Sequence, residues 1–441
     1  MSTPHAIWSR YRLFIWGGRC AALAMIAVSL VCQLAFAGPG ELLVEKAQGA
    51  DFVVPKGTER ITFSPDGNRR VIVVRRDNSG PLGGLEVHVD QKAVGTYDEV
   101  GRIAFSPDAK RLAFRARRKD QWVLFVDRAE VELIGGPLDP RMDWDPVFSP
   151  QGELAYIDGV PNNRRCRLIR EQDQEAAVWQ AIDSPRFSPN GKDFAYLAQQ
   201  DDEWFIVRNG DRVAGSTADF FSQGSLKFSP DGSQLACDGY RKKGRGFVVF
   251  DDNVSEPFDQ VWHMAFSPNG KHFAFSAARD RKWLFVVDGI EMPARNAVSW
   301  IVFSPDSRVM AYKEIPGKRR AIAMCPGVEE KEYPAIDELA FSWDSKRLAY
   351  AAIDNTGYRV VSNGQEGPVF DYIGNISFSA DSKHIAYIAK QKEKLMMVCD
   401  GIQGPVHDDV YALDYMKHKP DRMRYIVVDD GRGRVVEAEW P

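Results

Sequence analysis

This chain lacks the short motifs that mark most hydrolases, metalloenzymes and nucleotide-binding proteins. It contains no Gly-x-Ser-x-Gly, no His-Glu-x-x-His, no EF-hand loop and no phosphate-binding glycine loop. Its seven histidines form no close pair, and its six cysteines fit no zinc-binding spacing. We therefore expect no catalytic residue, no metal ligand and no cofactor from local motifs. A divalent cation held in a channel by distant residues would leave no such motif.

Positive charge is not in excess. Lys and Arg number 57 against 61 Asp and Glu, which gives a net charge of −4. Residues 1–37 carry three arginines and no acid, so their removal lowers the net charge to −7. Nucleic-acid binding needs a basic face. The composition therefore predicts no nucleic-acid partner.

Long apolar runs are limited to the N-terminus, which has the pattern of a secretory signal peptide. Arg10, Arg12 and Arg19 precede an apolar run from Cys20 to Phe36, and Ala35-Phe36-Ala37 is a small-x-small cleavage pattern. The run is at the short limit for a spanning helix, so an uncleaved anchor is the alternative. We expect a signal peptide at 1–37, a short segment at 38–50, a periplasmic or secreted protein, and no stable membrane span after cleavage.

A repeated phrase dominates the rest of the chain. Phe63-Ser64-Pro65-Asp66-Gly67 recurs in nine copies that all begin Phe-Ser, at Phe63, Phe105, Phe148, Phe187, Phe228, Phe266, Phe303, Phe341 and Phe378. The copies are 37 to 43 residues apart, and Tyr415 marks a degenerate tenth copy. A period near 40 built from strand patterns is typical of a β-propeller.

One repeat encodes four short strands. After Phe105, a Ser-Pro-Asp turn leads to the alternating pattern of residues 111–115, and a charged loop leads to the apolar strand 122–126. Asn-Gly or Asp-Gly then follows the third strand in four copies, which favours a type I′ hairpin. An alanine eight residues after the Phe recurs in most copies, where a small side chain lets a neighbouring sheet approach. The pattern predicts an all-β propeller of four-stranded blades over residues 51–441.

The two ends of the chain are expected to share a blade. Residues 51–54 form a lone strand pattern, and the last repeat supplies only three strands. One ring of ten blades, two smaller rings and an irregular array all fit the count, and we favour one continuous array. Cys166, Cys237, Cys325 and Cys399 fall in alternate repeats, so no intramolecular disulfide is expected.

The phrase Phe-Ser-Pro-Asp-Gly-(Lys/Arg)-Arg-Leu-Ala-Tyr resembles the WD-repeat-like propeller repeat of the TolB type. Residues 228–237 and 341–350 are close to its consensus, and the resemblance covers about residues 50–441. It implies a propeller fold and leaves the function open, because one fold hosts many activities.

Two periodic polar features are candidate binding residues. Seven residues before the repeat aromatic lie Asp98, Asp259, Asp371 and Asp408, which we expect around one mouth of the central channel. They could bind a cation or cationic ligand there, although aspartate in such loops also caps turns. The loops between second and third strands are basic, and their candidate residues are Arg117, Arg118, Arg241, Lys242, Lys243, Arg281, Arg319 and Arg320. They would attract anionic partners, or only be solvated.

These observations predict an exported, non-enzymatic propeller that binds or scaffolds a protein partner. One alternative is a hydrolase or lactonase-like propeller enzyme with a metal site at the channel mouth. Another is carbohydrate binding, for which Trp122, Trp204 and Trp283 lie beside the basic loops. The partner and the oligomeric state are open at this point.

Overall fold

The computed structural model describes residues 45–76, 84–136, 142–160, 165–171, 178–241, 244–317, 320–327, 330–412 and 422–440. Within these ranges the chain forms strands and turns without a helix, so none of the described residues belongs to a helix that could cross a membrane. The predicted signal peptide, Tyr415, Lys242, Lys243 and Arg319 lie outside the described residues.

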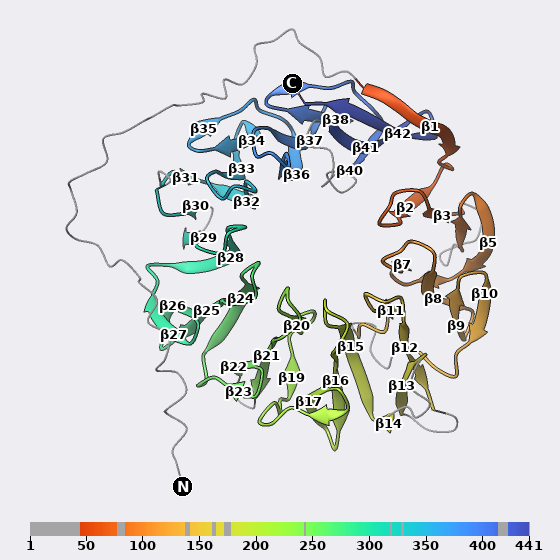
Figure 1. Cartoon of the computed structure of the whole chain (residues 1–441), viewed down its shortest axis with the longest axis vertical. Coiled ribbons are helices and arrows are strands. Elements are labelled where there is room, and N and C mark those ends of the chain that lie inside the picture. The colour runs from red at the N-terminus through yellow and green to blue at the C-terminus, as the bar shows by residue number, and fades with distance from the viewer. Residues whose placement is uncertain are drawn as a thin grey trace, which may run out of the picture.

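The described strands form ten blades arranged around an open centre (Figure 1). Blade 1 contains β2 (Thr58–Phe63), β3 (Arg70–Arg75), β4 (Leu85–Val89) and β5 (Lys92–Tyr97). Blade 2 contains β6 (Glu99–Val100), β7 (Ala104–Phe105), β8 (Leu112–Arg118), β9 (Gln121–Val126) and β10 (Ala129–Glu132). Blade 3 contains β11 (Val147–Phe148), β12 (Leu154–Gly159), β13 (Cys166–Arg170) and β14 (Val178–Trp179). Blade 4 contains β15 (Ala181–Phe187), β16 (Phe194–Gln200), β17 (Glu203–Arg208) and β18 (Asp211–Arg212).

In the next five blades, as in the first four, the strands are given in order from the centre outward. Blade 5 contains β19 (Phe220–Phe221), β20 (Lys227–Phe228), β21 (Leu235–Arg241), β22 (Arg245–Phe250) and β23 (Asn253–Val254). Blade 6 contains β24 (Gln260–Phe266), β25 (Phe273–Arg279), β26 (Lys282–Val287) and β27 (Ile290–Pro293). Blade 7 contains β28 (Ala297–Phe303), β29 (Met310–Gly317), β30 (Arg320–Met324) and β31 (Glu332–Tyr333). Blade 8 contains β32 (Ala335–Phe341), β33 (Leu348–Asp354), β34 (Gly357–Ser362) and β35 (Gln365–Glu366). Blade 9 contains β36 (Tyr372–Phe378), β37 (Ile385–Gln391), β38 (Lys394–Cys399) and β39 (Ile402–Gln403).

Blade 10 closes the ring with strands from both ends of the chain. Its order from the centre is β40 (Asp409–Ala412), β41 (Arg422–Asp429), β42 (Arg432–Glu439) and β1 (Glu45–Val53). The shared blade is confirmed, and its N-terminal strand is longer than the four residues predicted. His407 joins the two ends, since its Nε2 lies 3.0 Å from Glu45 and its Nδ1 lies 2.8 Å from Asp429. The single ring of ten blades is therefore the arrangement that the chain adopts.

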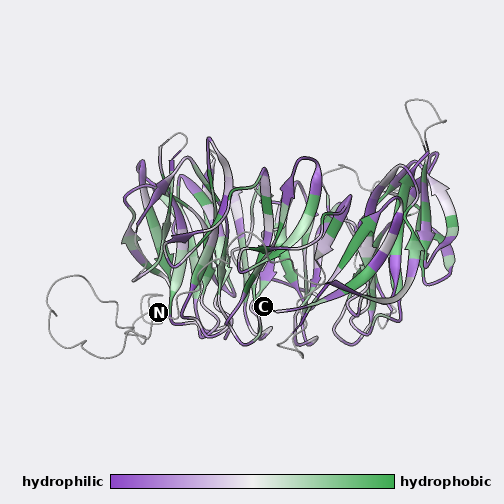
Figure 2. Cartoon of the chain, turned by 90° about the horizontal axis from the view of Figure 1, so that it is seen from above, coloured by the Kyte–Doolittle hydropathy of each residue, from purple (hydrophilic) through white to green (hydrophobic). Residues whose placement is uncertain are grey.

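The hydrophobic core is divided among the junctions between blades. Ten clusters of buried residues each combine side chains from two adjacent blades, including blades 10 and 1. The recurring alanines are fully buried there, as Ala113, Ala195, Ala274 and Ala349 show. From the side, apolar residues fill the middle of the blades and hydrophilic residues follow both rims (Figure 2). Each blade is therefore stabilised by its neighbours, as expected for a repeat array.

The repeated phrase forms the turn between the first and second strands. Ser64 Oγ donates to Asp66 Oδ1 at 2.5 Å and accepts a hydrogen bond from the Arg69 backbone N–H at 2.9 Å. The same two bonds recur in eight of the nine repeats. These turns and the third-to-fourth-strand hairpins lie at the same end of each blade, which we call the repeat-turn face. The opposite end, with the second-to-third-strand hairpins and the connections between blades, is the crossover face.

Two smaller predictions are confirmed. Asn209 and Gly210 have φ of 52° and 90°, and Asp288 and Gly289 have φ of 49° and 79°, as a type I′ hairpin requires. The four described cysteines are free thiols, and those of Cys166, Cys237 and Cys399 are buried.

Candidate functional site

The innermost strands carry a repeated β-bulge. Five blades have a non-glycine residue with positive φ three positions before the repeat Phe: Ser184 (53°), His263 (27°), Trp300 (54°), Glu338 (43°) and Asn375 (57°). The strand register shifts at or beside each of them. Such backbone is uncommon for residues with a side chain, and bulges re-aim side chains near functional sites. We call this site the bulge position.

The bulge position holds different chemistry in each blade. His263, Trp300 and Asn375 are exposed, Glu338 is half-buried and Ser184 is buried. Each innermost strand pairs with the second strand on one edge, and both sheet faces pack on neighbouring blades (Figure 1). The exposed side chains in the middle of these strands therefore face the central opening. Trp300 remains 38% exposed, whereas the 37% exposed ring of Trp262 lies across its own blade, 4.6 Å from the ring of Trp283 in the third strand.

Blades 5 to 7 bring basic and aromatic side chains together on this inner wall. The ring centroids of His263 and Trp300 are 6.3 Å apart, and Lys313 Nζ lies 5.7 Å from the Trp300 ring. Lys227 Nζ donates to the Met264 carbonyl at 3.3 Å. Partial desolvation between the blades lowers the pKa of His263, and the charges of Lys227 and Lys313 lower it further. Lys227, Trp262, His263, Trp300 and Lys313 are called the channel cluster below.

Acids on the inner wall have a different role, because they join adjacent blades. Glu338 accepts hydrogen bonds from the backbone N–H groups of Asn375 at 2.9 Å and Ile376 at 2.8 Å. Asp145 accepts one from the Arg102 N–H at 3.0 Å, and burial raises the pKa of Asp145. These carboxylates are thus used within the fold. The lysines of the channel cluster also bond across blades, since Lys313 Nζ donates to the Ile336 carbonyl at 3.1 Å, and they bring positive charge beside the exposed Trp300 ring.

The four predicted aspartates lie on the crossover face, each just before its blade's innermost strand. Their carboxylates accept a backbone N–H from the second-to-third-strand hairpin of the same blade: Asp98 from Lys119 (2.5 Å), Asp259 from Arg281 (3.3 Å), Asp371 from Lys392 (2.8 Å) and Asp408 from Asp430 (2.9 Å). This contact explains their periodicity, because every such hairpin leaves an N–H to be bonded. The described residues contain no cluster of His, Cys, Asp or Glu suited to a metal ion. A binding role for the aspartates stays a prediction.

The predicted basic residues that are described lie on the crossover face, and several are already paired. Arg118 pairs with Glu130 at 3.0 Å, and Arg320 with Glu332 at 2.5 Å. Arg241 donates to the carbonyls of Gly215 and Thr217, and Arg117 lies 3.4 Å from Glu99. Arg281 is exposed. Arg115, beside them in β8, is buried. The positive field of this rim is therefore smaller than the residue count suggests, and its role in binding is untested.

The channel cluster was not found by the sequence analysis. Its only signal is positional, because the residue three before each repeat Phe varies while the Phe-Ser that opens each phrase does not. Alternation alone would place this residue on a buried sheet face, and the bulge is what turns it outward. Trp122, Trp204 and Trp283, which were considered instead, are only partly exposed and pack at blade junctions or against Trp262.

Comparisons with known proteins give the following similarities. Residues 254–285, which run from the end of blade 5 into the third strand of blade 6, match the family model "WD domain, G-beta repeat". No curated protein matches the sequence. The solved structure of TolB from Acinetobacter baumannii is 18% identical, with 52% of this chain and 64% of that chain covered and a TM-score of 0.29. A eukaryotic initiation factor (12% identity, 76% and 95% covered, TM-score 0.44) and the Dos1 propeller (12% identity, 68% and 91% covered, TM-score 0.35) are also similar. The chain is a ten-bladed β-propeller, and its residues 254–285 are similar to a WD repeat.

Proposed function

We propose that this protein is an exported, non-enzymatic propeller that binds a protein partner through its central opening, in the cell envelope or outside the cell. The observation that carries this proposal is the bulge position. Five blades repeat one unusual backbone geometry there and vary the side chain. A rigid scaffold that presents different side chains from equivalent positions is suited to selective binding. The proposed binding needs no cofactor.

The chemistry of the channel cluster favours an anionic partner surface. Lys227 and Lys313 supply two positive charges, and Trp262 and Trp300 supply exposed indole rings for stacking. Carbohydrate binding is the second candidate, because exposed indoles also stack on sugar rings. Export is supported by the composition of residues 1–37, and a mature N-terminus at Gly38 is the expected result of N-terminal sequencing.

The test is crosslinked affinity capture from extract of the source cell, with the partner identified by mass spectrometry. We expect Lys227→Glu combined with Lys313→Glu, and separately Trp300→Ala, to abolish capture. The matched control is Lys110→Glu with Lys383→Glu, since these lysines are 81% and 76% exposed on the repeat-turn face. Capture unchanged by the channel variants would contradict the proposal. Capture lost after glycosidase treatment of the extract would favour the carbohydrate candidate, and stoichiometric metal in protein purified without chelator would favour an enzyme.

A further inference from the structure

Arginine side chains cross several blade junctions on the repeat-turn face. Each reaches a backbone carbonyl in the next blade's repeat turn: Arg69 to Lys110 (2.8 Å), Arg111 to Gly152 (3.0 Å), Arg208 to Ser233 (3.1 Å) and Arg347 to Ser382. A guanidinium suits this position because it offers several fixed N–H donors and keeps its charge. These crossings fill the space between adjacent blades at this end of the ring.

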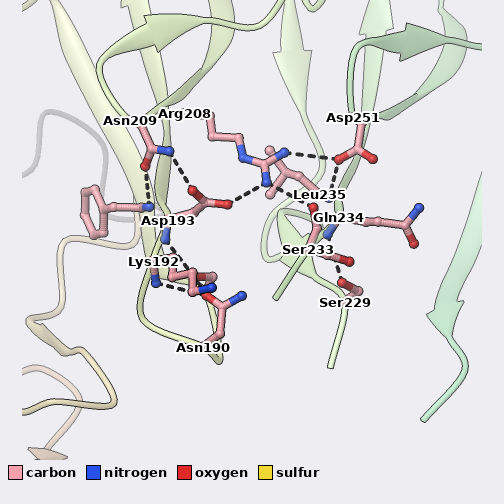
Figure 3. A network of polar contacts seen from close by, with 12 residues as sticks. Asn190, Lys192, Asp193, Arg208, Asn209, Ser229, Ser233, Gln234, Leu235 and Asp251 are labelled. Carbon is pink, nitrogen blue, oxygen red and sulfur yellow. Dashed lines mark hydrogen bonds and ion pairs between the residues drawn. The ribbon is translucent and has the colours of Figure 1, made fainter. Parts of the chain in front are cut away.

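The junction between blades 4 and 5 shows what such an arginine does (Figure 3). Arg208 pairs with Asp193 of its own blade at 2.6 Å and with Asp251 of the next blade at 3.1 Å. Its guanidinium carbon lies 5.8 Å from the ring centroid of Phe228. The side chain thus neutralises an acid on each side of the junction while lying against an aromatic ring.

The junction between blades 5 and 6 has the same backbone and lacks this arginine. Phe250 replaces Arg208 at the end of the third strand, and Gln234 replaces Asp193 six residues after the repeat Phe. The Phe250 ring lies 6.1 Å from Phe266, matching the distance from Arg208 to Phe228, and stacks on Phe273 at 5.0 Å. Among the described residues Gln234 Oε1 is buried without a hydrogen-bond partner. At this junction no side chain among the described residues makes with Gln234 the polar contact that Arg208 makes with Asp193 at the preceding junction.

A pocket of about 700 Å³ opens at this junction. Phenylalanine rings, among them Phe250 and Phe273, form part of its lining. The charged lining residues are Asp252, Glu256, Asp288 and Glu291, and no Lys, Arg or His lines the pocket among the described residues. Asp288 is paired with His272 and Glu291 with Arg279. Asp252 and Glu256 are exposed and have no ion pair within the described part of the chain.

A second hollow gives an internal comparison. It measures about 410 Å³ and lies between blades 7 and 8, where Val309 takes the position of Asp193. Its charged lining residues are Lys346 and Arg347, and no acid lines it among the described residues. Both hollows thus occur at junctions that no arginine crosses, but their charges are opposite. Charge therefore distinguishes what each can bind.

We propose that the pocket between blades 5 and 6 binds an arginine side chain of a partner polypeptide. The incoming guanidinium enters the pocket beside Phe250, whose ring itself fills the place that Arg208 takes at the preceding junction. Its methylene groups lie against the rings of Phe250 and Phe273, and its N–H groups bond to the carboxylates of Asp252 and Glu256. Arginine fits because it stacks on aromatic faces and pairs with carboxylates at the same time. The volume is within the range of pockets that hold small ligands. This site is separate from the channel cluster and does not depend on its function.

The first test uses n-butylguanidinium as the probe and n-butylurea as its uncharged counterpart, titrated into the purified protein by calorimetry or ligand-observed NMR. We expect saturable binding of n-butylguanidinium at one site and at least tenfold weaker binding of n-butylurea. Equal binding of the two probes, or binding of neither, would overturn the proposal.

Variants locate the site. Asp252→Asn with Glu256→Gln should weaken n-butylguanidinium binding by about threefold or more, as the loss of two exposed charge contacts implies. The matched control, Asp202→Asn with Glu203→Gln, removes two exposed acids from the crossover face of blade 4 and should leave binding unchanged. Phe250→Arg should abolish probe binding, because the protein then supplies its own guanidinium. If Phe250→Arg does not fold, the Asp252→Asn/Glu256→Gln variant and its matched control test the proposal instead. Unchanged affinity in Asp252→Asn/Glu256→Gln would sink the proposal.

Discussion

The junction between blades 4 and 5 and the junction between blades 5 and 6 use one backbone plan and different chemistry. In the first, Arg208 links Asp193 and Asp251 across the junction (Figure 3). In the second, Phe250 takes its place and stacks on Phe273, and an acid-lined pocket remains. The hairpin aspartate is the same in both, since Asp251 and Asp288 each accept the N–H of the second strand at 2.9 Å.

The two junctions show which contacts the fold requires and which positions accept different side chains. The serine and aspartate bonds of the repeat turn recur almost unchanged, because they satisfy backbone groups that would otherwise be unpaired. The crossing position varies more, because Arg208 donates to the Ser233 carbonyl at one junction and Phe250 takes its place at the next, where the turn keeps the same bonds. Positions of this kind, like the bulge position, are where a repeat protein can acquire binding sites.

The largest expected effect comes from removing the crossing arginine. Arg208→Met leaves Asp193 and Asp251 without their shared cation in a partly buried site, so we expect a loss of about 2 kcal/mol in the free energy of unfolding. Urea denaturation followed by circular dichroism measures it. Arg308→Met, at an exposed arginine on the same face, is the control and should change stability by less than about 0.5 kcal/mol. Equal effects in the two variants would contradict the structural role of Arg208.

A rescue experiment sharpens the comparison. Arg208→Ala should open a space at the first junction between Asp193 and Asp251, two acids that a guanidinium can pair with. Added n-butylguanidinium should then restore about 1 kcal/mol at several times its dissociation constant, because a ligand that binds the folded state stabilises it. Thermal unfolding with and without the probe measures this gain. The wild-type protein and n-butylurea are the controls, and a gain no larger than theirs would show that the two sites are not equivalent.

The stability of blade 10, which closes the ring, should depend on pH through His407. Burial alone would lower the pKa of His407, but hydrogen bonds to Glu45 and Asp429 outweigh it and raise this pKa. A raised folded-state pKa stabilises the protein fully below the ordinary value of about 6.5 and loses this contribution as pH rises through the raised pKa. Wild-type protein should therefore lose stability relative to His407→Gln as the pH rises above about 6.5. Parallel urea midpoints for the two proteins across this range would refute the assignment.

The smallest expected effect concerns the hairpin aspartates of the crossover face. Asp371→Asn keeps an acceptor for the Lys392 N–H at 2.8 Å but removes its charge, so we expect a loss of about 0.5 kcal/mol. The corresponding change at Asp259, whose bond is longer at 3.3 Å, should cost less. Thermal melting of both variants measures the difference. A loss of ligand binding with no change in stability would instead support the predicted binding role.

Much of the fold could be predicted because each repeat encodes the same turns and strands through neighbouring residues. The turn after Phe105, the apolar strand before Asp127 and the Asn209-Gly210 hairpin depend on neighbouring residues, and all are found as predicted. The candidate sites were harder to predict. Arg118 and Glu130 are twelve residues apart, and nothing local shows that the acid neutralises the arginine. The same holds for Asp98, whose partner is the N–H of Lys119.

The sequence by itself determined the blade, its turns and the sharing of the last blade between the two ends, because these follow from strand periodicity and turn chemistry within about 40 residues. Tertiary structure alone decided that ten blades close into one ring, that bulges turn His263 and Trp300 towards the opening, and that a pocket exists beside Phe250. The physical reason is distance along the chain. Ring closure, side-chain exposure and charge pairing are set by contacts between blades, and a repeat pattern describes only what lies within one.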